Sequence, residues 1–163
     1  MDTSTRRHLP RRKMESNIVE SVGALVYCES TKRFLFLLRP GDRRHKKSWG
    51  LVGGKIETGE TIQQGLVREI AEEIAFDASD RKFVPIEKFT STDGRFVYHT
   101  FMMSVQKEFC PTLNEEHTGY CWTPLDDYPK PLHPGVWRSF SFQVVVDKIK
   151  TIQQLITDHT KHP

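Results

Sequence analysis

Apolar residues recur along the chain at two different spacings, and these spacings predict its secondary structure. Leu66, Val67, Ile70 and Ile74 recur at helical spacing in a segment without proline, so we predict a helix that begins at Thr61. Elsewhere, short runs of β-branched and aromatic residues separated by turn-forming residues predict strands. The predicted strands span residues 18–27, 33–38, 49–52, 83–90, 95–107 and 119–123.

The C-terminal part of the chain combines a proline-rich segment with a second helical pattern. Four prolines in residues 124–134 predict a stiff loop. Apolar residues then predict one final helix over 135–157, although the β-branched run 144–146 weakens the helical pattern. The order of elements suits a mixed sheet between helices, and the pattern by itself leaves both α/β and α+β open. The apolar positions of the final helix are Val136, Phe140, Val144, Ile149, Ile152 and Ile156.

Length and composition describe one globular domain. A chain of 163 residues is long enough to bury one core, and we assign the domain to residues 17–158, with tails at 1–16 and 159–163. The sequence has neither an apolar run of about 18 residues nor a charged start followed by an apolar segment, so we expect no membrane span and no secretion. Cys28, Cys110 and Cys121 lack CxxC spacing, which favours reduced thiols and a cytoplasmic location.

The net charge of +3 is concentrated in the first 16 residues, which carry five basic and two acidic side chains. The other 19 basic and 19 acidic residues balance. We interpret 1–16 as a disordered basic arm. Because the rest of the chain is neutral, we expect no nucleic-acid binding except through this arm.

Three glutamates of the predicted central helix share one face. At about 100° per residue, Glu69, Glu72 and Glu73 fall within an arc of roughly 100°, beside the apolar face. Such a face is usually a solvated one. Like charges this close repel one another unless a cation is held between them, and Mg²⁺ accepts clustered carboxylate oxygens. The face is therefore either solvated or a platform for a divalent cation.

Further residues at fixed distances favour the metal platform. The segment 54–76 reads Gly, five residues, Glu, seven residues, Arg-Glu, an apolar residue, any residue, Glu-Glu. If each residue type occurs at roughly 6–7%, six such matches arise by chance on the order of 10⁻⁷ times per start position. The segment resembles the signature of the Nudix (MutT-like) hydrolase family. It departs from that signature at Ala75, where the family has Gly, and at Val52, where the family usually has Pro.

The resemblance implies an α/β/α sandwich with a mixed sheet, and a hydrolase that cuts a pyrophosphate bond with Mg²⁺ or Mn²⁺. It implies metal ligands at Glu69, Glu72, Glu73 and the carbonyl of Gly54. It also implies that Arg68, paired with Glu60, orients the carboxylates. The family often uses one more acid outside the signature, shortly before a Trp-ended strand. Glu116 is our candidate for this ligand or general base, with Glu115 as the spare; Glu72 or Glu73 are alternative bases.

Substrate contacts depend on less specific features. Arg39 and Lys47, in a basic loop and its border, are candidates to meet phosphates, and Tyr98 is a candidate to stack on a base. The expected substrate is a nucleoside diphosphate linked to another moiety: a nucleotide sugar, ADP-ribose, a dinucleoside polyphosphate or a nucleoside triphosphate. The alternatives are a non-catalytic nucleotide-binding module, an RNA 5′-end pyrophosphohydrolase and the isomerase branch of the fold. Relatives are commonly dimeric, so a homodimer is possible.

Overall fold

The computed structural model describes residues 17–42 and 44–161, and the predicted basic arm at 1–16 lies outside them. One mixed sheet of seven strands forms the centre of the described chain. Its path is β3-β2-β1-β6-β5, with β4 also paired to β1 and β7 to β2. The strands are β1 (Val19–Cys28), β2 (Arg33–Leu38), β3 (Trp49–Gly50), β4 (Val52–Lys55), β5 (Val84–Thr90), β6 (Phe96–Val105) and β7 (Gly119–Thr123).

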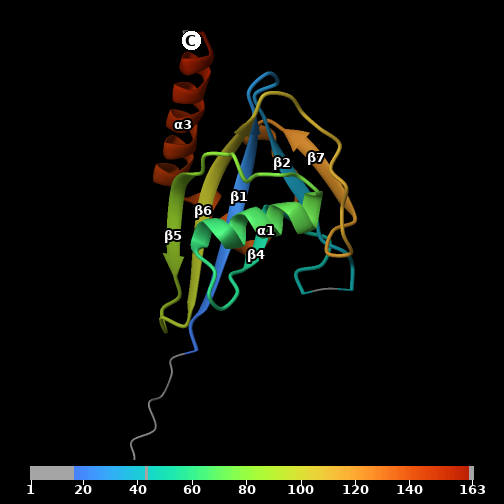
Figure 1. The fold of residues 1–163 in the computed structure, drawn as a ribbon, viewed down its shortest axis with the longest axis vertical. Helices are drawn as coiled ribbons and strands as arrows, with labels where there is room; N and C mark the ends of the chain where they lie inside the picture. Colours follow the sequence, from blue (N-terminus) through green and yellow to red (C-terminus); the bar gives the residue numbers. More distant parts are fainter. Residues whose placement is uncertain (1–16, 43, 162–163) are drawn as a thin grey trace, which may run out of the picture.

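Strand β1 is the central strand of the sheet and contributes to two cores. It pairs in parallel with β6 and antiparallel with β2 and β4. Because successive side chains of a strand point to opposite faces, its apolar residues divide between the two sides of the sheet. Val22, Ala24 and Val26 pack with residues of α1 (Ile62–Ile74), the helix that crosses the sheet in Figure 1. Leu25 and Tyr27 pack with residues of α2 (Pro134–Ser141) and α3 (Gln143–Lys161).

Helix α1 begins at the predicted position with a reciprocal cap. Thr61 Oγ1 accepts the Gln64 N–H at 3.1 Å, and Gln64 Oε1 accepts the Thr61 N–H at 2.9 Å. The helix ends at Ala75, which has φ 52° and ψ 37° in the left-handed region. Glycine adopts this conformation more easily than alanine, so the departure at Ala75 introduces backbone strain at the helix end.

The expected strand 49–52 is two strands in the structure. Trp49–Gly50 pairs with β2, and Val52–Lys55 pairs with β1. Gly53 and Gly54 follow the predicted strand and lie in β4, opposite Gly23 and Val22. Gly53 has φ 149°, and a Cβ there would lie 2.1 Å from the Val22 carbonyl oxygen. The absence of side chains thus allows two backbones to approach closely.

The predicted single helix over 135–157 was also wrong, because Phe142 interrupts it. Phe142 has φ −91° and ψ 114°, which is extended backbone between α2 and α3. The break changes which valine faces the core: Val144 is 74% exposed, whereas Val145 is 8% exposed and packs with Ile149. Helix α3 continues through Lys161, so the predicted domain end at residue 158 falls inside it.

The layers agree with the fold class expected from the sequence. Helix α1 covers one face of the mixed sheet and helices α2 and α3 cover the other, which confirms the α/β/α arrangement. No helix within residues 17–42 and 44–161 is long and apolar enough to cross a membrane.

Candidate active site

Three carboxylates from two segments meet beside α1. Glu69 and Glu73 lie one turn apart on the helix, and Glu116 comes from the loop between β6 and β7. One carboxylate oxygen of each lies within 4.8 Å of the others. We call these three residues the acid cluster. Glu69 and Glu73 are buried, with 7% and 2% of their surfaces exposed. The structure therefore brings together three of the acids predicted as metal ligands.

The electrostatics of the acid cluster oppose ionisation. Burial raises the pKa of Glu73 to about 7, although a hydrogen bond from His117 acts in the other direction. Burial also raises the pKa of Glu69, against hydrogen bonding from Arg68. A divalent cation among these oxygens would favour the ionised forms. Three carboxylates are the donor set that Mg²⁺ and Mn²⁺ prefer, so the residues fit the predicted cofactor.

Glycine at position 54 makes room for one member of the cluster. A Cβ on Gly54 would lie 2.6 Å from the carboxyl carbon of Glu69, which is closer than real Cβ contacts allow. Gly54 lies in β4, directly beside α1. The sequence predicts its carbonyl as a metal ligand, and this stays a prediction. The structure adds that the missing side chain lets the Glu69 carboxylate reach its position.

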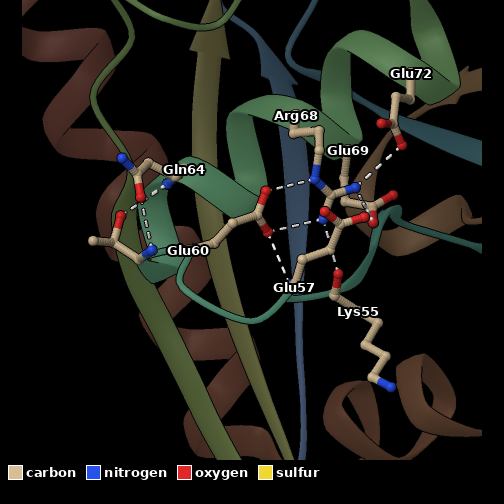
Figure 2. A network of polar contacts seen from close by, with 8 residues as sticks. Lys55, Glu57, Glu60, Gln64, Arg68, Glu69 and Glu72 are labelled. Carbon is tan, nitrogen blue, oxygen red and sulfur yellow. Dashed lines mark hydrogen bonds and ion pairs between the residues drawn. The ribbon is translucent and has the colours of Figure 1, made fainter.

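Arg68 connects the acid cluster to the loop before α1 (Figure 2). Its Nε donates to Glu60 Oε1 at 2.6 Å, and Nη2 donates to Glu60 Oε2 at 3.0 Å and to the Lys55 carbonyl at 2.9 Å. Its Nη1 donates to Glu69 at 2.9 Å and to Glu72 at 3.1 Å. The Arg68 hydrogen bonds lower the pKa of Glu60 to about 2. Arg68 therefore has the geometry expected of a residue that orients carboxylates.

Two other predicted acids lie outside the acid cluster. Glu72 points toward Arg68 in Figure 2, and its side chain is 54% exposed. Glu115, the spare candidate in the loop, is exposed. In the structure the Glu72 carboxylate accepts a hydrogen bond from Arg68 and lies outside the acid cluster. The role of Glu72 as a metal ligand or base stays a prediction.

A cavity of about 550 Å³ lies beside the acid cluster, between the sheet and helices α2 and α3. Glu73 and Glu116 line it, together with the two glycines of β4. Cavities of this volume are typical of small-molecule sites that combine apolar walls with a few polar groups. The apolar lining includes Leu25, Ile86, Phe89, Phe96, Val136 and Phe140.

A second polar group lines the same cavity. Glu87 accepts hydrogen bonds from Arg138 at 2.7 Å and from Ser139 at 2.5 Å. The Arg138 guanidinium also lies 4.0 Å from the centre of the Phe89 ring. All four residues line the cavity, and sequence analysis did not find them. They come from β5 and α2, so only the folded chain brings them together.

The predicted substrate contacts differ in their positions. Arg39 and Tyr98 line the cavity, whereas Lys47 is exposed and is not part of its lining. Among the residues that the structure describes, Arg39 Nε is buried without a hydrogen-bond partner. Burial and the nearby Arg39 lower the pKa of His133, another lining residue, to about 4, so that this histidine is neutral near pH 7. Arg39 thus brings a positive charge to the cavity wall.

Tyr98 packs tightly against the central strand. A Cβ on Gly23 would lie 2.1 Å from the Tyr98 hydroxyl oxygen, so the ring occupies space that any other residue at position 23 would fill. Burial raises the pKa of Tyr98, and the charge of Glu73 adds to this effect. The phenol therefore stays neutral near the acid cluster. Its predicted stacking role stays a prediction.

Sequence analysis also missed His117, which directly follows Glu116. Its Nε2 lies 2.9 Å from Glu73 Oε2, and its side chain is 7% exposed. The sequence shows no metal-ligand pattern among the seven histidines, so none was named. The available signal was the position of His117 next to the extra acid.

Comparisons with known proteins agree with this geometry. A family model for the NUDIX domain matches residues 18–142. The chain is 31% identical over 118 residues to a dihydroneopterin triphosphate diphosphatase of Haemophilus influenzae, which covers 63% of this chain and 72% of the relative. It is 29% identical over 121 residues to a CTP pyrophosphohydrolase of Escherichia coli, which covers 72% of this chain and 85% of the relative.

Solved structures give the same fold. The crystal structure of a MutT NUDIX hydrolase from Burkholderia pseudomallei superposes with a TM-score of 0.63 at 22% identity, over 76% of this chain and 95% of that one. The chain belongs to the Nudix hydrolase family. The predictions of the family, the fold and a pyrophosphohydrolase as the enzyme class are confirmed.

Proposed function

We propose that this protein uses Mg²⁺ or Mn²⁺ to hydrolyse a ring-bearing triphosphate of the nucleoside triphosphate type, releasing a monophosphate and pyrophosphate. The observation that carries the proposal is the acid cluster, Glu69, Glu73 and Glu116, beside a cavity with aromatic walls. Phosphates need cations where they react, whereas a flat ring needs apolar surface. In this protein the proposed cation site and the aromatic cavity wall are adjacent, because Glu73 and Glu116 line the same cavity as Phe89 and Phe96.

Each residue of the acid cluster has a role in this proposal. Glu69, Glu73 and Glu116 would hold the metal, which supplies charge neutralisation to the phosphates and lowers the pKa of a bound water. A water oxygen forms a bond to the α-phosphorus while the bond from that phosphorus to the bridging oxygen of pyrophosphate breaks. The proton lost by the water goes to a carboxylate, for which Glu116 is our candidate. Arg68 keeps Glu69 in position through its bond at 2.9 Å.

The cavity supports a triphosphate over the other expected substrates. Arg39 lines the cavity, and its guanidinium is a cationic group that suits phosphate oxygens. Phe89 and Phe96 offer aromatic surface to one ring, and Glu87 with Arg138 offers polar partners to the ring's edge. The two relatives described above are named for dihydroneopterin triphosphate and CTP, which are both ring-bearing triphosphates.

A substrate panel tests the proposal. The purified full chain is incubated with CTP, GTP, dihydroneopterin triphosphate, ADP-ribose, a nucleotide sugar and a dinucleoside polyphosphate in Mg²⁺, and the products are identified by phosphorus NMR. We expect pyrophosphate from a triphosphate, with kcat/KM at least about tenfold above that for the diphosphate-linked compounds, a difference of about 1.4 kcal/mol. A preference for ADP-ribose, or release of orthophosphate alone, contradicts the proposed substrate.

Two neighbouring glutamates give a matched control. Glu116→Gln removes the candidate base, and we expect turnover to fall at least a hundredfold, about the contribution of general base catalysis. Glu115→Gln changes an exposed neighbour outside the cluster, so its turnover should equal that of the unmodified chain. Equal rates for both variants would remove Glu116 from the mechanism. Nucleotide binding without turnover would support the non-catalytic module.

A further inference from the structure

His117 links the two segments that form the acid cluster. It lies in the loop that carries Glu116, and its Nε2 lies 2.9 Å from Oε2 of Glu73 on α1. The same Oε2 accepts the backbone N–H of Gly53 at 3.2 Å. Glu73 is 2% exposed, and the His117 side chain is 7% exposed, so water competes little for these bonds. Two donors from different segments therefore meet on one carboxylate oxygen.

The two ring nitrogens of His117 have different surroundings. A carboxylate that holds a cation is ionised and can only accept, so Nε2 is the donor toward Glu73. Nδ1 is buried and has no hydrogen-bond partner within residues 17–42 and 44–161. An N–H at Nδ1 would be left unsatisfied, which costs free energy, whereas a bare lone pair costs less. The contacts thus favour a proton on Nε2, which is donated to Oε2 of Glu73.

We propose that His117 is a positioning residue that fixes the orientation of Glu73. By donating to Oε2 together with Gly53, it directs Oε1 of Glu73 toward a cation shared with Glu69 and Glu116. It also holds the loop of Glu116 against α1. Residues that hydrogen-bond to metal ligands have this effect in other proteins, where their loss typically costs about 10- to 100-fold in metal affinity or activity. The inference rests on the proposed metal-dependent function.

A second buried histidine provides a comparison within the same protein. His99 Nε2 lies 2.6 Å from Glu20 Oε1, and the His99 side chain is 11% exposed. Neither residue lines the cavity or belongs to the acid cluster. Loss of the His99 contact tests the effect of breaking a histidine–glutamate hydrogen bond outside the cluster, although Glu20 is more exposed than Glu73.

Three variants of the full chain test the inference. His117→Phe keeps a ring and removes both nitrogens, whereas His117→Gln keeps an amide N–H at a similar reach. His99→Phe is the control. Mn²⁺ affinity is measured by electron paramagnetic resonance without substrate, and kcat and KM are measured with the best triphosphate. We expect His117→Phe to weaken Mn²⁺ binding about 10- to 100-fold, with a fall in kcat larger than the rise in KM.

The other two variants should bind Mn²⁺ within about threefold of the unmodified chain, less than the roughly tenfold loss expected when the donor is removed. His117→Gln keeps a donor, and His99 lies outside the acid cluster. Unchanged Mn²⁺ affinity in His117→Phe overturns the inference. Equal losses in His117→Phe and His117→Gln overturn it too, because ring packing and not the donor would then matter. If the unmodified chain binds no Mn²⁺, the proposed function itself has failed, and this outcome differs from the other two.

Discussion

Glu60 and Glu73 are two carboxylates close to the same helix, and their surroundings act on them in opposite directions. Glu60 accepts two hydrogen bonds from Arg68 and one from the Glu57 N–H, and these bonds lower its pKa to about 2. Glu73 is buried near Glu69, and burial raises its pKa to about 7. The first carboxylate is satisfied by the protein itself, whereas the second is ionised only at a cost.

The difference shows how a glutamate-rich segment can contain two kinds of acid. The bonds from Arg68 end on Glu60, Glu69, Glu72 and the Lys55 carbonyl. Arg68 neutralises the Glu60 side of the segment, and a bound metal ion would supply positive charge beside the buried Glu73. The Glu60–Arg68 pair is thus expected to stabilise the fold, and the acid cluster is expected to carry the chemistry at some cost to stability.

Replacing Glu73 should have the largest effect. Glu73→Gln removes a charged metal ligand, and several kcal/mol of lost charge stabilisation corresponds to about a 10³-fold fall in kcat at 1.36 kcal/mol per tenfold. The melting temperature in chelator should not fall, because a buried charge has been removed. Product chromatography and circular dichroism measure the two quantities. A variant that unfolds, or one that turns over at the full rate, breaks the comparison.

Replacing Glu60 should lower stability and have a smaller effect on activity than replacing Glu73. Glu60→Gln removes the ionised partner of Arg68, so we expect the melting temperature to fall by a few degrees. Activity should fall by only about tenfold, because Arg68 still contacts Glu69 and holds it less firmly. Thermal unfolding and steady-state rates, measured beside those of Glu73→Gln, check the prediction. An equal loss of activity in both variants would mean that the two acids are not different in kind.

Ala75→Gly should change stability without changing metal binding, and its effect should be the smallest of the three. Ala75 has φ 52° at the end of α1, and glycine adopts this left-handed conformation without the Cβ penalty. We expect about 1 kcal/mol of added stability, or a melting temperature higher by about 2–4 °C, with Mn²⁺ affinity unchanged. Differential scanning calorimetry measures the first quantity. A variant with altered Mn²⁺ affinity would show that the end of α1 also shapes the acid cluster.

Much of the fold follows from local patterns in the sequence. Thr61 and Gln64 form a cap, and Leu66, Ile70 and Ile74 form a buried stripe, so α1 is specified by residues near one another. The break at Phe142 was missed because nothing local distinguishes it. Apolar residues continue on both sides, and the choice of Val145 over Val144 is made by the sheet against which α3 packs.

The sequence predicts a site residue only where its distance along the chain from other residues identifies it. Glu69 and Glu73 follow from their positions on one helix, and Glu116 follows from its distance to Trp122 in the family pattern. His117, Glu87 and Arg138 depend on which loops and strands meet in three dimensions, and no spacing records this. Lys47 is the opposite case, because its position in a basic loop predicted a phosphate contact that the fold does not support. The residue is exposed and does not line the cavity.

The most direct test of the acid cluster as a metal site is anomalous diffraction. A crystal of the full chain is soaked with Mn²⁺ and a non-hydrolysable triphosphate, and data are collected at the manganese edge. We predict a peak of anomalous density among the carboxylates of Glu69, Glu73 and Glu116, in contact with the phosphates. Triphosphate in the cavity with no such peak, or a peak held by other residues, would contradict it.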